Sequence, residues 1–424
     1  NPTFILTGFV ITGWTVRDEA GATTSATISG TLYQVGTGVN SAIIEQSVSV
    51  APADVGVEHA LRVEVTRGPS TIMVGSTSGG DDYVSETQLE TGTHSLSFTP
   101  TGTFYIQFKN RETYQTIVAS CTVESAGVVT ISTPWGASDI GNIRYDQSGD
   151  VVYIACDGYQ TRRIERRGTR PNGRSWSLVK HYLRDGPFLV QNIGPITITP
   201  SALVGDVVFT ASQALFKSTD VGSAMSITSP GQNVTISSAV SGTPTSSIRV
   251  TGISGARSFS VIISGNASVS TVNLQRSFDD ATWVNVAGST WTTNITTTYA
   301  DGLDNQIVYY RLMLTTRVAP DTVTMNLVYS GGSVRAYCEC TAVTNSLVAG
   351  FRVVTPSSLG SLTATDIWQL SKFSSTNGWP TSVGFHEGRL WWSGRNGIVG
   401  SVSDAFSSFD ETIVGDSAPI SRTI

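Results

Sequence analysis

The sequence has few charged side chains, and it has no long apolar run. Charged residues make up 14% of its 424 residues, against about 25% in an average globular protein. No apolar stretch approaches the roughly 18 residues that a membrane-spanning helix needs. The net charge of −6 argues against a general nucleic-acid binder, because such a protein depends on a strongly basic face for its affinity.

Cysteine is also scarce. The four cysteines (Cys121, Cys156, Cys338 and Cys340) are too few and too scattered for a disulfide framework. Cys338 and Cys340 would share one face of a strand, but no nearby pair of histidines or cysteines completes a four-ligand zinc site. We therefore expect buried free thiols, no metal and no cofactor. Reduced thiols favour folding in a cytosol.

The two ends of the sequence lack the features of natural termini. The opening stretch, NPTFILTGFVITGWTV, has no initiator methionine, basic leader or small-residue cleavage site. The last residues, DSAPISRTI, stop without a closing element. We expect the sequence to be a piece of a larger protein.

Glycine, serine, threonine and alternating apolar residues are abundant. Period-two alternation recurs from end to end, for example in HALRVEVTRG and TGTFYIQFKNR. Turn signals such as GGDD, SGD, RDGP and RNG separate these runs. Helical turns are plausible only around residues 357–373. The predicted fold class is therefore all-β, with several β-domains.

Composition divides the chain into four blocks, which is compatible with its length. The third block consists almost entirely of Ser/Thr/Val/Ile strands and is expected to be an inserted Ig-like β-sandwich, because hairpin tips accept self-contained domains most easily. The second and fourth blocks share strands, polar turns and aromatics typical of propeller blades, and the propeller they would form is either closed or incomplete. The expected blocks are an N-terminal β domain (1–130), propeller-like strands (131–199), the sandwich (200–333), and further propeller-like strands (334–424) that continue beyond the last residue.

Motifs for catalysis are weak. The stretch SFDDATW (277–283) is one residue short of the sialidase turn S-x-D-x-G-x-T-W and lacks its glycine, so we expect a hairpin turn. The pair His386–Glu387 is the best local acid and base, but a hairpin turn before a buried RLWW strand is the favoured interpretation. Acid pairs fall in predicted turns, where aspartate is favoured, at Asp81/Asp82 and Asp146/Asp150. We expect no catalytic residues.

A cluster of arginines stands out against this weakly charged background. Within 13 residues only Glu165 offsets Arg162, Arg163, Arg166, Arg167, Arg170 and Arg174. The arginine fork suits phosphates or the carboxylates of a neighbouring subunit, and a charged edge also prevents indiscriminate sheet pairing. Subunit contact, edge protection and DNA contact all stay open as interpretations.

Three stretches, taken in order, resemble one family of bacteriophage proteins. They are GSTSGGDDYVSETQLETGTHSLSFTPTGTFYIQF, then IRYDQSGDVVYIACDGYQTRRIERRG with SWSLVKHYLRDGPF, and finally GWPTSVGFHEGRLWWSGRNGIVGSVSDAFSSFD. Together they resemble the tail nozzle, or tail-tubular-B-like, proteins of short-tailed phages and prophages, mainly over 70–190 and 376–410. The first 60 residues have no counterpart in the resemblance. Its motif residues are Trp176, Asp185, Gly186, Pro187, Gly388, Arg389, Trp391 and Trp392.

The resemblance implies a structural virion protein with no enzymatic activity, assembled in the host cytoplasm. Such proteins form a homohexameric ring below the adaptor and portal, make the distal tail tube for ejection of double-stranded DNA, and carry tail fibres or receptor-binding proteins. The arginine cluster would then meet acidic groups of the next subunit.

Two other classes stay open. One is a carbohydrate-binding tail adhesin that uses the 200–333 sandwich. The other is a glycan-degrading enzyme with Trp379, Trp391 and Trp392 as sugar platforms.

Overall fold

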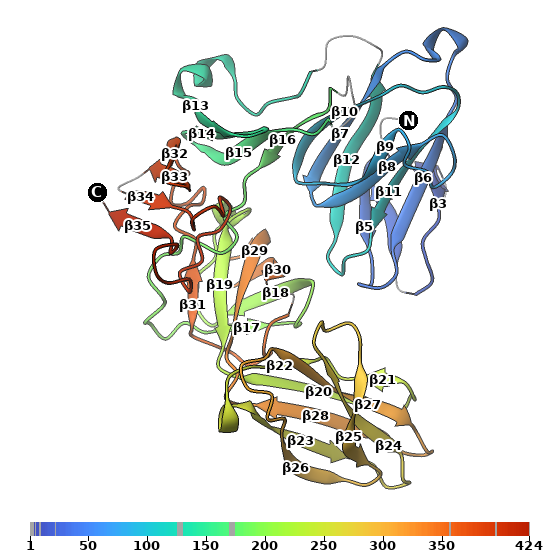
Figure 1. Cartoon of the computed structure of the whole chain (residues 1–424), viewed down its shortest axis with the longest axis vertical. Helices are drawn as coiled ribbons and strands as arrows, with labels where there is room; N and C mark the ends of the chain where they lie inside the picture. The colour runs from blue at the N-terminus through green and yellow to red at the C-terminus, as the bar shows by residue number, and fades with distance from the viewer. Residues whose placement is uncertain are drawn as a thin grey trace.

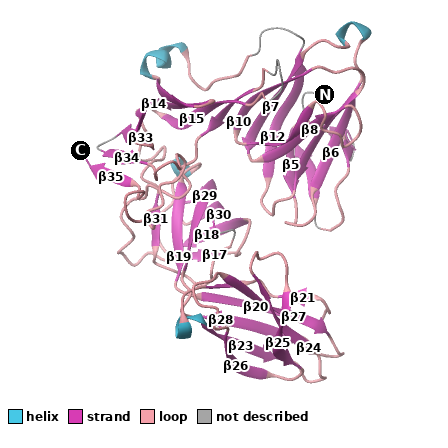
Figure 2. Ribbon diagram, viewed as in Figure 1, coloured by secondary structure: helices cyan, strands magenta, loops and turns pink. Residues whose placement is uncertain are grey.

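The protein is described here by a computed structural model covering residues 4, 6–7, 10–21, 23–124, 130–168, 174–355, 358–394 and 397–423. Its elements are mostly strands, which confirms the all-β prediction (Figure 2). The helical turns expected around 357–373 are wrong for the described residues 358–373, which make isolated bridges and one short strand because Leu359 and Trp368 are buried against a sheet. The described helices are short 3-10 helices, namely η1 (Pro52–Asp54), η2 (Ala137–Asn142), η3 (Ser218–Asp220) and η4 (Ser254–Arg257).

The N-terminal part is a sandwich of two antiparallel sheets. One has, in spatial order, β3 (Thr15–Val16), β6 (Ala42–Val48), β11 (Phe104–Asn110), β8 (Ser70–Gly75) and β9 (Val84–Leu89). The facing sheet has β13 (Arg144–Ser148), β14 (Val151–Cys156), β15 (Tyr159–Arg166), β16 (Trp176–Lys180), β10 (Gly92–Phe98), β7 (His59–Arg67), β12 (Thr116–Glu124), β5 (Thr31–Val35) and β4 (Thr24–Ile28). A separate ribbon pairs β1 (Leu6–Thr7) with β2 (Val10–Ile11).

Alternation in the sequence explains the core between these sheets. Leu61, Val63 and Val65 of β7 point inward and are buried, as HALRVEVTRG predicts. Phe104 and Phe108 of β11 enter the same core from the other sheet. The polar residues between them face outward because side chains alternate along a strand.

The nine-stranded sheet extends well beyond the N-terminal sandwich. Strand β16 pairs with β10 in the register Ser95↔Trp176, and β15, β14 and β13 follow outward from it. Figure 1 shows these green strands leading away from the blue sandwich. The backbone ladder therefore crosses residue 130, where composition changes, and the division into blocks stays a prediction.

A six-stranded sheet forms the middle of the molecule. It contains β17 (Ile198–Pro200), β18 (Asp206–Ala211), β30 (Val348–Thr355), β29 (Val334–Asn345), β19 (Ala224–Ser229) and β31 (Trp368–Leu370). Strands β19 and β29 are direct neighbours, and their ladder ends at the pair Ser229↔Val334. The chain between these two residues leaves the sheet and returns to the same point.

That excursion is a sandwich with its own hydrophobic core, seen at the bottom of Figure 1. One sheet holds β20 (Gln232–Ser238), β28 (Val323–Tyr329), β23 (Ser258–Ser264) and β26 (Ile295–Ala300). The other holds β21 (Thr243–Pro244) and β22 (Ile248–Val250), both on β27 (Val308–Thr316), followed by β24 (Thr271–Ser277) and β25 (Val284–Trp291). The inserted sandwich is thus confirmed. Its predicted start at residue 200 is wrong, because β18 and β19 are ladder partners of β30 and β29 in the six-stranded sheet and the strands of the sandwich begin with β20.

The C-terminal residues form a four-stranded antiparallel sheet of β32 (Ser382–His386), β33 (Arg389–Gly394), β34 (Gly397–Gly400) and β35 (Ile420–Thr423). A four-stranded meander has the form of one propeller blade. It packs beside β13 and β14, and the described sheets do not close into a ring of blades.

Candidate functional site

The second and third family-like stretches meet at one place, which we call the joint: β13–β15, the loop 181–187 and the sheet β32–β35. The first stretch lies in the N-terminal sandwich and is linked to the second by the β10–β16 ladder. The backbone N–H of Phe385 in β32 donates to the Asp146 carboxylate of β13 at 2.7 Å. A buried aromatic core joins the two sides, consisting of Tyr153, Ala155, Leu183, Phe373, Trp379, Leu390, Trp392, Val399 and Phe409. The joint therefore connects segments that lie far apart in the sequence.

Asp185, Gly186 and Pro187 fasten the loop of the joint. The two carboxylate oxygens of Asp185 accept hydrogen bonds from the Ser408 hydroxyl at 2.6 Å and the Phe409 N–H at 2.8 Å. Gly186 has φ +133°, and a Cβ there would lie 2.8 Å from the Phe409 carbonyl oxygen, so only glycine fits. The N–H of Lys372 donates to the Pro187 carbonyl at 2.9 Å.

Replacing Asp185 tests this fastening. Asp185→Ala loses both hydrogen bonds to 408–409 and is expected to lower the free energy of unfolding by about 2 kcal/mol. Urea unfolding followed by tryptophan fluorescence measures the change. The exposed Asp157→Ala in the β14–β15 turn serves as control and is expected to change stability by less than about 0.5 kcal/mol. Equal midpoints for both variants would contradict a fastening role.

The residues of the C-terminal motif also serve packing. Glu387 and Gly388 have φ values of 49° and 69°, which suit the type I′ turn between β32 and β33. The buried Arg389 guanidinium donates to the carbonyl oxygens of Ser401 at 2.6 Å and Ala418 at 2.7 Å, with further bonds to those of Asp416 and Ser417. It therefore holds the 416–418 segment.

The two tryptophans of this motif differ in exposure. Trp392 is fully buried and its ring lies 5.5 Å from that of His181. Trp391 is partly exposed and donates to the His386 carbonyl at 3.1 Å. Trp176, at the start of β16, is outside this core and 37% exposed. His386 and Glu387 are exposed on the turn, with His386 Nε2 3.8 Å from the Glu387 carboxylate.

Most of the described arginines of the cluster are paired within the chain. Arg163 and Arg167 share the Glu165 carboxylate, and Arg174 pairs with Glu58 at 2.6 Å. The Arg166 side chain is 55% exposed and lies 3.7 Å from the Asp150 carboxylate, which is 71% exposed. Arg162 lines a pocket on the nine-stranded sheet, and Arg170 lies outside the described residues.

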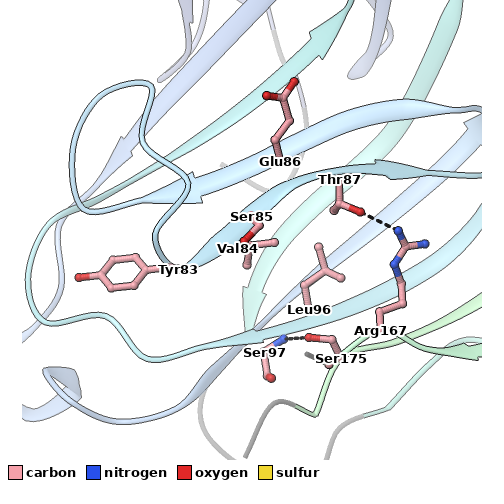
Figure 3. Close-up of a pocket in the computed structure, with 10 residues that line it drawn as sticks. Tyr83, Val84, Ser85, Glu86, Thr87, Leu96, Ser97, Arg167 and Ser175 are labelled. Carbon is pink, nitrogen blue, oxygen red and sulfur yellow. Dashed lines mark hydrogen bonds between the residues drawn. The ribbon is translucent and has the colours of Figure 1, made fainter. Parts of the chain in front are cut away.

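Arg167 closes a small pocket of about 200 Å³ beside β9 and β10 (Figure 3). Its guanidinium donates to the Thr87 hydroxyl at 2.8 Å and the Gln88 carbonyl at 2.6 Å. The pocket is lined by Tyr83, Val84, Ser85, Glu86, Thr87, Leu96, Ser97, Arg167, Gly168 and Ser175. Because Arg167 is already bonded on several sides, the pocket offers a ligand little unsatisfied charge.

A pair of aspartates, invisible as a pair in the sequence, lines a cavity of about 470 Å³ at the joint. Burial raises the pKa of Asp185. Burial also acts on Asp410, but hydrogen bonds from Thr412 and Tyr337 outweigh it and lower the pKa of that carboxyl. Such opposed shifts can mark an acid and a base. Here, however, both carboxylates bind backbone or side-chain donors of the chain, so their geometry is explained by packing.

The other sequence candidates have structural surroundings. The SFDDATW stretch is the β24–β25 hairpin turn, as expected, and the Asp279 carboxylate accepts from the backbone of Ala281 and Thr282. All four cysteines are free and buried, as predicted. In the part of the chain that the structure describes, no three His, Cys, Asp or Glu side chains gather as metal ligands, and no helix is long and apolar enough to cross a membrane.

Comparisons with known proteins place few constraints on this chain. No family model matches it, and no curated protein matches it. Three similar solved structures are the N-terminal CBM22-1–CBM22-2 tandem domain of Paenibacillus barcinonensis Xyn10C (10% identity, 87% of this chain and 95% of that one, TM-score 0.20), an IolB-like protein of Salmonella typhimurium LT2 (9%, 74% and 90%, 0.14), and procruciferin, an 11S globulin of Brassica napus (8%, 76% and 86%, 0.13). At these TM-scores the similarities carry no argument about function.

Proposed function

We propose that this chain is a structural protein of a bacteriophage tail, of the nozzle type found in short-tailed phages. One observation carries the proposal: the three stretches that resemble nozzle proteins, although distant in sequence, are neighbours in the fold. The first pairs with the second through β10 and β16, and the second packs on the third at the joint. There the polar groups of Asp185 and Arg389 are bonded to the chain itself. Residues that hold a shape are expected to be bonded in this way, whereas catalytic groups face a cleft.

The pairing of the arginines reduces the number of residues that could form the proposed subunit contact. Arg163, Arg167 and Arg174 pair with carboxylates of their own chain, which leaves Arg166 as the more exposed guanidinium with a distant partner. We place Arg166 at the contact with the next subunit, in a heterologous interface that closes by rotation into a ring.

The first test is the assembly state. Particle averages of the purified protein are expected to show six-fold rings with an open lumen, and averages of intact tails should show the same ring below the adaptor. A protein that is monomeric in solution and also absent from a ring in intact particles would overturn the proposal.

Charge reversal tests the contact itself. Arg166→Glu is expected to abolish full rings, because it reverses the charge at the proposed contact. The fold should stay intact, because the side chain is exposed. Native mass measurement reports the stoichiometry. The control Arg111→Glu reverses an exposed arginine of the N-terminal sandwich and is expected to retain full rings. Full rings with Arg166→Glu would remove this residue from the interface.

A carbohydrate-binding adhesin is the second candidate, favoured by the self-contained core of the inserted sandwich. It would be supported instead if the monomeric chain bound cells in a manner competed by free sugar.

A further inference from the structure

A further pocket lies on the outer face of the nine-stranded sheet, where β7, β10, β16 and β15 lie side by side. Its volume is about 390 Å³, within the range of small-molecule sites. The hydroxyl of Thr93 donates to the Ser132 carbonyl at 3.0 Å and so fixes the 132–134 segment over the sheet. The outer-sheet pocket is lined by Glu64, Val65, Thr66, Thr91, Gly92, Thr93, Ser132, Thr133, Pro134, Arg162 and Lys180.

Two cations stand directly opposite one another in this pocket. Arg162 of β15 is the ladder partner of Lys180 of β16, so their side chains leave the same face of the sheet. Like charges in this position destabilise a sheet. Among the described residues neither side chain has an ion-pair or hydrogen-bond partner, and the Nε of Arg162 is buried without an acceptor.

The surroundings make this arrangement costly. Burial lowers the pKa of both Arg162 and Lys180. The Arg162 charge lowers the pKa of Lys180 further, and the charge of Glu339 offsets this only in part. Glu64 is the one carboxylate among the described lining residues, and it is exposed and forms no ion pair with either cation. The other arginines of the cluster that the structure describes, Arg163, Arg166, Arg167 and Arg174, have acidic partners, so this pair is the exception. An anion bound between the two cations would relieve both the repulsion and the buried donor.

We propose that the outer-sheet pocket binds the phosphate group of a small ligand between Arg162 and Lys180. A phosphate has enough oxygens to accept from the guanidinium fork and the ammonium at once. A planar carboxylate whose two oxygens bind the guanidinium fork has fewer acceptor positions for the lysine ammonium than a phosphate has. The pocket exceeds the volume of inorganic phosphate alone, so a phosphomonoester fits better. This proposal does not rest on a role in the tail.

Calorimetric titration of the full chain with inorganic phosphate and with phenyl phosphate tests the site. We expect both to bind, and Arg162→Gln and Lys180→Gln each to weaken the affinity about tenfold or more, because each removes charged hydrogen bonds. Arg166→Gln, four residues further along the chain and exposed, is the matched control and should bind as tightly as the unchanged chain. Equal affinity in Arg162→Gln, or no binding of either probe, would overturn the proposal.

Two further arms separate the alternatives. Without phosphate, Lys180→Gln is expected to raise the melting temperature, because it removes the opposed like charge. A lower melting temperature would indicate that the lysine stem serves packing and that no anion is needed.

Duplex DNA titrated at the same ionic strength is expected to bind no more weakly to Arg162→Gln than to the unchanged chain. Loss of DNA binding in this variant, with no binding of phenyl phosphate, would assign the pair to nucleic acid instead. Ring assembly is measured on Arg162→Gln and Lys180→Gln and should be unchanged, which separates this proposal from the tail proposal.

Discussion

Lowering the pH from 7 to 5 is expected to reduce the free energy of unfolding by about 4 kcal/mol, through two buried histidines. Burial lowers the pKa of His94 to about 3, and burial together with the charges of Arg163 and Arg184 lowers that of His181 to about 3. In the unfolded chain both rings protonate near pH 6.5. Because the pKa of each ring is lower in the folded chain, the stability that the neutral rings contribute is fully present above pH 6.5 and is lost as the pH falls toward 3.

Both histidines lie at β16, so the exchange rates of its backbone amides report the effect of protonating the rings. His94 Nδ1 is 2.7 Å from the Ser177 hydroxyl of β16. His181 follows β16 directly, and its backbone N–H donates to the Thr161 carbonyl of β15. Hydrogen exchange of the β10–β16 ladder, measured from pH 7 to 5 and corrected for intrinsic rates, gives the local free energy of opening. His94→Gln should halve the pH dependence. His386→Gln, whose ring is exposed, should leave it unchanged. A flat profile in the unchanged chain would contradict neutral burial of these rings.

Asp301→Asn is expected to destabilise the inserted sandwich by about 3–5 kcal/mol, because it leaves a buried arginine without its counter-charge. Arg257 and Asp301 are fully buried and form two parallel hydrogen bonds, from Nε at 2.6 Å and from Nη2 at 2.7 Å. The Tyr310 hydroxyl also donates to this carboxylate at 2.7 Å. Although burial raises the pKa of Asp301, these donors lower it to about 2, so the carboxylate is ionised at neutral pH.

The effect should stay within the sandwich, because its core is separate from those of the other sheets. Exchange in β27 should accelerate strongly, while exchange in β10 and β33 should not change. Asp304→Asn is the control: this exposed aspartate only accepts from the Ser254 N–H at 2.7 Å and should cost about 1 kcal/mol. Parallel loss of protection in β10 would show that the sandwich and the N-terminal part unfold together.

Local patterns in the sequence predict much of this fold. The alternation of Leu61, Val63 and Val65 fixes which face of β7 is buried. The all-β class and the inserted sandwich follow from equally local signals, since side-chain periodicity and turn residues act over a few positions. The buried thiols are predicted by the absence of further ligands.

Long-range pairing is what the sequence does not reveal. Nothing around Ser95 indicates that its ladder partner is Trp176, and this pairing is what carries the N-terminal sheet into the next block. The arginine cluster shows the same limit: its run of cations is obvious, but its partner Glu58 comes from a distant segment. The opposition of Arg162 and Lys180 depends on strand register, which sets which residues face each other across a hairpin.

The insertion at Ser229 and Val334 has a consequence for how such a chain can diversify. Because the two residues are partners in one ladder, the chain enters and leaves the sandwich through neighbouring strands. A different module, or a short loop, could occupy that position without displacing a strand of the six-stranded sheet. The molecule thus has a position at which a whole module can be exchanged by recombination, while the six-stranded sheet keeps its sequence.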